Sequence, residues 1–157
     1  MDKLQLHIQG LESRETAEIC ANLMAQSEPW ITLKRGYHES LEIILDNKRE
    51  VYVAWHGKNI LGFIIVEMNG TFKGYIKSVY VSPKHRGRGI GTKLVDYAEK
   101  RIFSETSNVF LLVSSFNSGA RKLYTNLGYE EVGELRDFII QGESEILMRK
   151  TIGPLTE

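Results

Sequence analysis

The chain has 157 residues, with 20 lysines and arginines against 20 aspartates and glutamates. That length suits one domain, and its 25% charged and 42% hydrophobic residues argue against disorder and against a globally basic nucleic-acid binder. A single cysteine, Cys20, excludes a disulfide framework and is expected to be a small apolar residue in a helix. The four histidines lack metal-ligand spacing, so we expect no metal. No leader-like segment and no run of about 20 apolar residues occurs, which predicts a cytoplasmic protein without a membrane partner.

Hydrophobic periodicity predicts the elements in chain order. The first three are a strand over residues 4–8, a helix from a Ser13 or Thr16 cap to about Gln26, and a helix over residues 37–46. The inner stripes of these helices are expected to be Ile19, Leu23 and Met24, and then Leu41, Ile44 and Leu45. The later elements are strands over 51–55, 60–68 and 75–81, a helix over 90–102, a strand over 109–115, a helix over 120–127, and strands over 129–140 and 143–150.

The order β-α-α-β-β-β-α-β-α-β-β places strands and helices around one core. The fold class is therefore α+β, or mixed α/β, in a single domain over residues 1–157 with a polar tail at 153–157. The helix between the fourth and fifth strands is a crossover connection, which predicts that these two strands are parallel. The last two strands leave an open sheet edge, so both a monomer and a homodimer fit the sequence.

The sharpest local feature is a glycine-rich loop, PKHRGRGIGT at residues 83–92, between the fourth strand and the next helix. Glycines let the backbone approach a ligand closely, and the first N–H groups of a helix have no internal partners. The loop therefore predicts a site for an anion, usually a phosphate, with Arg86 and Arg88 adding positive charge. It lacks the P-loop spacing, and Thr92 replaces the third glycine of a dinucleotide fingerprint. Taken alone, it could also be a plain glycine-rich turn.

A second motif follows one strand later. Residues 117–129 resemble motif B of the GNAT superfamily of acyl-CoA N-acyltransferases, N-x-x-A-x-x-x-Y-x-x-x-G-F/Y. Each fixed position is present, as Asn117, Ala120, Tyr124, Gly128 and Tyr129. The glycine loop is similar to motif A, Q/R-x-x-G-x-G/A, through Arg86, Gly89 and Gly91. Both motifs occur in order, separated by a helix and a strand, and the resemblance spans nearly the whole chain.

The resemblance implies a mixed, mostly antiparallel sheet of about seven strands with helices on both faces. It implies that strands four and five are splayed by a β-bulge, and that acetyl-CoA is the co-substrate, with its pyrophosphate on the loop and its pantetheine arm beside strand four. The implied cofactor-binding residues are Val79, Tyr80, Val81, Arg86, Gly87, Arg88, Gly89, Ile90, Gly91, Thr92, Asn117 and Tyr124. Asn117 is an equally good helix N-cap, and the same residue could both cap the helix and bind the cofactor.

The resemblance further implies an N-acetyltransferase in which a neutral amine attacks the thioester directly in a ternary complex. Tyr124 is the candidate general acid, because a phenol with a pKa of about 10 can protonate a thiolate whose conjugate acid lies near about 8.5. Its alternative role is that of a core aromatic. A backbone N–H on strand four, such as that of Val81, could stabilise the tetrahedral oxyanion.

The acceptor is left open. The core motifs resemble the ribosomal-protein alanine N-acetyltransferase branch, but Leu112 stands where that branch has an acid on strand five. A small amine, an amino-acid derivative and a protein amine all remain possible acceptors. Transfer of acyl groups longer than acetyl is also left open.

The general base is left open too, with Glu67 as the nearest upstream acid. Residues 27–40 are the candidate acceptor-binding segment, where Trp30 and Tyr37 could wall a slot; Trp30 could equally pack the first helix on the sheet. The alternative function is a non-catalytic acyl-CoA-binding or sensing module. A nucleic-acid binder built on the short basic run at 84–88 ranks last.

Overall fold

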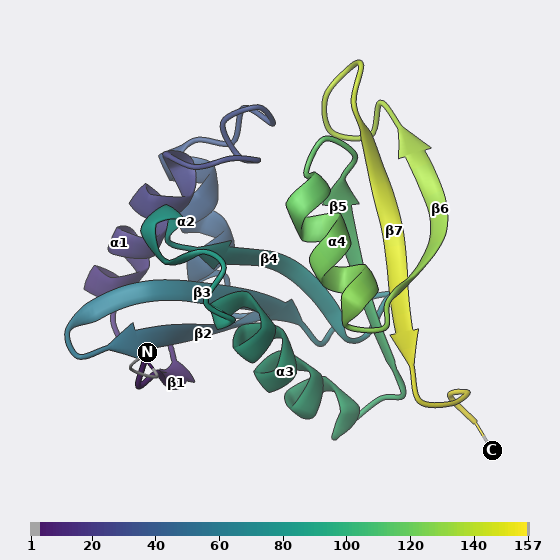
Figure 1. The fold of residues 1–157 in the computed structure, drawn as a ribbon, viewed down its shortest axis with the longest axis horizontal. Helices are drawn as coiled ribbons and strands as arrows, with labels where there is room; N and C mark the ends of the chain where they lie inside the picture. Colours follow the sequence, from purple (N-terminus) through teal and green to yellow (C-terminus); the bar gives the residue numbers. More distant parts are fainter. Residues whose placement is uncertain (1–3, 157) are drawn as a thin grey trace.

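The computed structural model describes residues 4–156. Its strands are β1 (His7–Gly10), β2 (Arg49–His56), β3 (Asn59–Glu67), β4 (Tyr75–Val81), β5 (Asn108–Ser114), β6 (Glu130–Arg136) and β7 (Ser144–Thr151). Its helices are α1 (Arg14–Ala25), α2 (Tyr37–Leu45), α3 (Ile90–Phe103) and α4 (Ser118–Asn126), with a short 3-10 helix η1 (Pro83–His85) before α3. The strands form one sheet in the order β1-β2-β3-β4-β5-β7-β6 (Figure 1). Every neighbouring pair is antiparallel except β4 and β5, which are parallel as predicted.

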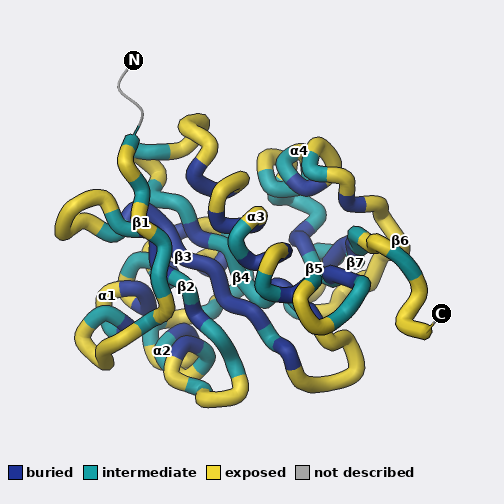
Figure 2. Tube along the Cα trace, turned by 90° about the horizontal axis from the view of Figure 1, so that it is seen from below, coloured by how far each residue is buried: buried dark blue, intermediate teal, exposed yellow. Residues whose placement is uncertain are grey.

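Helices cover both faces of the sheet, and each face has its own apolar core. Side chains alternate across a strand, so successive residues of β3 enter different cores. Phe63 and Ile65 pack in the core that α1 and α2 cover, whereas Ile64 and Val66 pack in the core that α3 and α4 cover. Burial therefore concentrates along the central strands (Figure 2). These two cores confirm the mixed α/β class.

Two strands, β1 and β6, differ most from the expected bounds. β1 begins at His7 because its register opposite Trp55 of β2 pairs only residues 7–10. β6 ends at Arg136, well before the predicted residue 140. Asp137 then adopts a left-handed backbone with φ 54°, and its Oδ1 accepts a hydrogen bond from the N–H of Gly142 at 2.7 Å. This side-chain bond closes a turn over residues that sequence alternation assigned to a strand.

The buried stripes of α1 and α2 also differ from expectation. Ser13 caps α1 by accepting a hydrogen bond from the N–H of Thr16 at 3.1 Å, which settles the choice of cap. The side of α1 that faces the sheet is formed mainly by small residues, and its buried members are Ala17, Cys20, Ala21 and Met24. Ile19 is 45% exposed, and Leu45 of α2 is 38% exposed. Small residues allow close packing, so the stripe follows them and not the largest apolar side chains.

The sheet opens between β4 and β5. Their pairing is limited to Tyr75 with Phe110 and Ile76 with Leu111, whereas β5 pairs with β7 along its whole length. A β-bulge in β4 lies beside the last of these pairs, with Lys77 as the extra residue opposite β3. A bulge bends its strand and increases the local twist. The bulge and the splayed strands expected from the sequence are therefore both present.

Candidate functional site

Two adjoining cavities lie where β4 and β5 separate. The loop cavity, of about 730 Å³, extends along the glycine loop, the end of β4 and the start of α4. The inner cavity, of about 140 Å³, lies deeper between β4, β5, β7 and the segment after α1. Both cavities are lined by Pro29, Trp30, Val79, Asn117, Ala120 and Tyr124. A molecule in the loop cavity would therefore meet a molecule in the inner cavity at these shared walls.

The glycine loop forms one end of the loop cavity. Gly87 and Gly89 have φ of 76° and 80°, a left-handed conformation that favours glycine. Gly89 caps α3 without any side-chain hydrogen bond, so the first N–H groups of α3 are free to face an anion. Arg86 lines the cavity beside these groups, but Arg88 is exposed and does not. The predicted loop residues thus gather at one site, apart from the side chain of Arg88.

The free edge of β4 forms the floor of the loop cavity. The N–H of Ser82 donates to the carbonyl of Leu61 at 2.8 Å, so the backbone groups of Ser82 face β3. Alternate residues of an antiparallel strand direct their N–H and C=O groups to opposite edges. The backbone groups of Val79 and Val81 therefore face the opening, where β5 is no longer paired. An extended ligand can therefore form hydrogen bonds with this edge in the way that an additional strand would.

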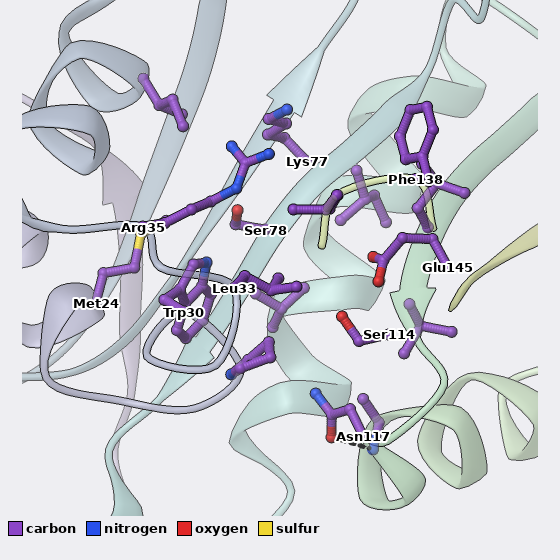
Figure 3. Close-up of a pocket in the computed structure, with 18 of the residues that line it drawn as sticks. Met24, Trp30, Leu33, Arg35, Lys77, Ser78, Ser114, Asn117, Phe138 and Glu145 are labelled. Atoms are coloured by element: carbon purple, nitrogen blue, oxygen red, sulfur yellow. Dashed lines mark hydrogen bonds between the residues drawn. The ribbon is translucent and has the colours of Figure 1, made fainter. Parts of the chain in front are cut away.

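Asn117 combines two roles at the start of α4. Its Oδ1 accepts a hydrogen bond from the N–H of Ala120 at 3.2 Å, which makes it the N-cap. Its amide nitrogen is directed toward the cavity (Figure 3). Capping uses only the side-chain oxygen, and the N–H groups of the same amide stay available as donors to a ligand.

Tyr124 lies on the shared wall of both cavities and is only 7% exposed. Its ring contacts the edge of Tyr129, with centroids 5.6 Å apart and planes at 67°. Burial, with a smaller effect of Tyr75, raises the pKa of the Tyr124 phenol. The hydroxyl is therefore protonated at neutral pH and can act as a proton donor.

A series of turns after α1 places Trp30 over the opening. The N–H of Leu33 donates to the carbonyl of Pro29 at 2.9 Å, and that of Arg35 donates to the carbonyl of Trp30 at 2.9 Å. The Trp30 ring lies 6.3 Å from Tyr80, which stacks on Phe63 with centroids 5.0 Å apart. Trp30 therefore packs against the sheet and also lines both cavities, and its contact with the acceptor stays a prediction.

Three charged side chains line the inner cavity, and none was singled out from the sequence. They are Arg35 from the turn segment, Lys77 from the β4 bulge and Glu145 from β7. Burial raises the pKa of Glu145, although the Ser114 hydroxyl and Arg35 act in the opposite direction. Burial and the neighbouring Arg35 lower the pKa of Lys77. A lysine and a glutamate within the apolar strand segments YIKSVYV and SEILM were the only sequence signals.

Two predicted acceptor residues, Tyr37 and Glu67, line neither cavity, although Glu67 is the β3 partner of Tyr75, which lines the inner cavity. Tyr37 begins α2 and its ring lies 5.4 Å from that of His38. Glu67 accepts a hydrogen bond from Nε of Arg49 at 2.7 Å, so its charge is neutralised locally. Leu112, by contrast, does line the inner cavity. The predicted contact of Tyr37 and Glu67 with the acceptor stays a prediction.

Two further classes of site were sought in the described part of the chain. Among residues 4–156, histidine, cysteine, aspartate and glutamate side chains form no group of three or more that could hold a metal ion. Within the same residues, no helix has the length and apolar character to cross a membrane.

Comparisons with known proteins point to one family. Residues 17–129 match the acetyltransferase (GNAT) family. The chain is 30% identical over 126 residues to an N-alpha-acetyltransferase of Sulfurisphaera tokodaii, covering 71% of this chain and 75% of that protein. It is 28% identical over 153 residues to the N-alpha-acetyltransferase RimI of Mycobacterium tuberculosis, covering 92% of each. With mouse thialysine N-epsilon-acetyltransferase it shares 31% identity over 107 residues, but these span only 53% of that protein.

Solved structures show the same fold. An aminoglycoside 6'-N-acetyltransferase complexed with coenzyme A superposes with a TM-score of 0.77 at 20% identity, covering 96% of this chain and 99% of that one. The ribosomal-protein-S18-alanine N-acetyltransferase of Escherichia coli superposes with a TM-score of 0.74 at 18% identity, covering 98% and 97%. The acceptors named for these proteins differ, so the shared fold does not define an acceptor.

Proposed function

Because the chain belongs to the GNAT acetyltransferase family, we propose that it transfers the acetyl group of acetyl-CoA directly to a primary amine in a ternary complex. The observation that carries this proposal is the junction of the loop cavity with the inner cavity at Tyr124. A thioester at that junction would have the cofactor on one side and the acceptor on the other. Direct transfer then needs no acylated residue, and Cys20 is fully buried in α1.

The loop cavity would hold the cofactor mainly through backbone groups. The pyrophosphate would bind the free N–H groups at the start of α3, around Gly87 and Gly89, with Arg86 beside them. The pantetheine arm would run along the free edge of β4 at Val79 and Val81 and accept a hydrogen bond from the Asn117 amide.

The transfer is a substitution at the thioester carbonyl. The amine must be neutral when it attacks, and the new N–C bond forms as the carbonyl oxygen becomes an oxyanion. The N–H of Val81 faces the opening and would stabilise that charge. The C–S bond then breaks, and Tyr124 would protonate the leaving thiolate. Because burial favours the neutral phenol, Tyr124 would hold its proton until the thiolate forms.

Calorimetric titration of acetyl-CoA and CoA into the purified protein tests the cofactor, with ATP and NAD as controls. We expect binding of the two CoA compounds alone, and acetyl-CoA-dependent release of free thiol when an amine is added. A folded protein that binds neither compound would contradict the proposal. Tight binding without thiol release for any amine tested would instead favour a non-catalytic acyl-CoA-binding or sensing module.

A further inference from the structure

The inner cavity is lined by opposite charges that form no ion pair with one another. Among residues 4–156, none of Arg35, Lys77 and Glu145 takes part in an ion pair. Glu145 is only 4% exposed. Charged groups withdrawn from water are normally paired, because their desolvation is costly. The arrangement therefore suits a ligand that brings both charges with it.

Lys77 is the residue of the β4 bulge and lines the inner cavity with its neighbours along the strand. Successive residues of a regular strand point to opposite faces of the sheet. Lys77 is the extra residue between Ile76 and Ser78 in the pairing with β3, and both Lys77 and Ser78 line the inner cavity. A bulge re-aims side chains in this way. The β4 bulge at the opening of the sheet thus also carries a positive charge that lines the inner cavity.

The charges are segregated within the cavity. The guanidinium of Arg35 and the ammonium of Lys77 lie near each other on the β4 side (Figure 3). The carboxylate of Glu145 lies across the cavity, with the Ser114 hydroxyl directed toward it. Ser114 and Glu145 are opposite each other in the β5–β7 pairing, so the sheet fixes their positions. One end of the cavity therefore suits an anion, and the other suits a cation.

We propose that the acceptor is a small amine that also carries a carboxylate, such as a free amino acid. Its amino group would lie toward Glu145 and its carboxylate between Arg35 and Lys77. This inference rests on the proposed acetyl transfer and adds the substrate class to it. The cavity of about 140 Å³ is close to the roughly 150 Å³ that holds a benzene molecule, which is in keeping with a small acceptor.

Charge disfavours the polycationic alternatives. A polyamine or an aminoglycoside would place extra ammonium groups beside Arg35 and Lys77, and like charges in a partly desolvated site repel strongly. Apolar side chains complete the wall, among them Leu33, Phe138 and Ile139. An amino acid with an apolar side chain would therefore match both the charges and the surface of the cavity.

The test compares matched amines that differ only at the carboxylate. Each of the twenty protein L-amino acids, its amide and its decarboxylated amine is supplied with acetyl-CoA, and the product is identified by mass spectrometry; L-leucine, L-leucinamide and 3-methylbutylamine form one such set. Spermidine serves as the polycation. We expect kcat/KM for the preferred acid to exceed that of its amide and amine by about 10- to 100-fold, as for charge-assisted hydrogen bonds.

Variants link that preference to the cavity. Arg35→Gln and Lys77→Gln should each reduce the preference for the carboxylate by about tenfold or more and leave acetyl-CoA affinity unchanged. Lys34→Gln is the matched control, because Lys34 is exposed in the same segment and lines neither cavity. It should keep the full preference.

Equal or better turnover of amides, amines or spermidine would overturn the inference, and so would a preference that survives in the Arg35→Gln/Lys77→Gln double variant. Both results leave the proposed acetyl transfer standing. No acetylated product from the panel although acetyl-CoA binds would also overturn the inference, and it would favour the non-catalytic acyl-CoA-binding module over the proposed transfer. Failure of acetyl-CoA to bind would instead contradict the proposed function itself, so the two failures are distinguishable. Calorimetric titration of the preferred amino acid into the CoA complex gives a readout independent of turnover.

Discussion

The two cavities that meet at Tyr124 are built in different ways. The loop cavity includes two short stretches whose backbone groups are free to bind a ligand, the glycine loop and the edge of β4. The inner cavity is formed by side chains from separate elements, including Arg35, Lys77 and Glu145. Backbone groups are present whatever the side chain, whereas side chains change with each substitution. A family that keeps one cofactor and varies its acceptor is suited to this division.

The largest effect is expected from a charge placed in the loop cavity. Gly89→Glu adds a carboxylate where we place the pyrophosphate, at a φ of 80° that disfavours a side chain. No atom lies within 4 Å of an added Cβ, so the fold should persist. Calorimetry should show acetyl-CoA affinity reduced by at least about 100-fold, from charge repulsion in a desolvated site.

Matched variants separate the charge from the strain. Gly89→Ala keeps the unfavourable φ without the charge, and Gly133→Glu adds the charge on β6 far from the loop. Both should bind acetyl-CoA far better than Gly89→Glu. Equal affinity of Gly89→Glu and the unmodified protein would remove the loop from the cofactor site.

A change at Tyr124, where the two cavities meet, should affect the chemical step and not the binding of acetyl-CoA. Tyr124→Phe removes the proposed acid while keeping the ring contact with Tyr129. We expect kcat to fall by about 10²-fold, as for loss of a general acid, with little change in acetyl-CoA affinity. Tyr97→Phe is the control, since that hydroxyl is on α3, next to Tyr52 and away from both cavities. Unmodified turnover in Tyr124→Phe would exclude the acid role.

A smaller effect would distinguish the two roles of Asn117. Asn117→Asp keeps an oxygen that can cap α4, and a negative charge is favourable at a helix N-terminus. It removes the amide donors that face the cavity. Thermal unfolding should therefore be unchanged or shifted upward, while acetyl-CoA affinity should fall by about 5- to 10-fold for one lost hydrogen bond. A drop in stability with unchanged affinity would leave Asn117 a cap only.

The smallest effect concerns the core under α1, away from both cavities. Burial raises the pKa of the Cys20 thiol from 9.0 to about 12. The folded protein keeps this proton above pH 9 while the unfolded chain releases it, so the free energy of unfolding should decrease as pH rises from 9 toward 12. One group contributes about 1.4 kcal/mol per pH unit in that window.

Comparison with a variant isolates this contribution. Denaturant unfolding of Cys20→Ala should show a shallower decline over the same window, whatever its stability at neutral pH. Buried tyrosines such as Tyr75, whose pKa burial raises to about 12, contribute equally to both proteins. Identical slopes would show that the thiol does not titrate differently on folding.

The sequence allowed the loop cavity to be predicted because its residues are local. The glycine loop and Asn117 lie in two contiguous motifs, and the crossover between β4 and β5 follows from handedness and element order. The helix predicted over residues 90–102 was correct, because Leu94, Val95, Ala98 and Ile102 recur at helical spacing on one face and are buried there. Where the helix period and the largest apolar residues coincide, sequence predicts burial well.

The inner cavity could not be predicted in the same way. Arg35, Lys77 and Glu145 are far apart in the sequence, and a bulge and a strand pairing bring them together. A bulge depends on the pairing of two strands and has no reliable local signal. Within the predicted α1 stripe Met24 is buried, but Ile19 is exposed, because small residues such as Ala17 face the sheet there. The bond of Glu67 to Arg49 joins two neighbouring strands and likewise has no local sequence signal.

The short contact between β4 and β5 has a consequence for the cohesion of the sheet. Four strands on one side and three on the other are joined by only two residue pairs, at Tyr75 and Ile76. A cofactor lying along Val79 and Val81 would supply ladder bonds that β5 does not. Bound acetyl-CoA would then link the two parts of the sheet through hydrogen bonds. The amide hydrogens along this edge should therefore exchange rapidly in the free protein and markedly more slowly in the complex.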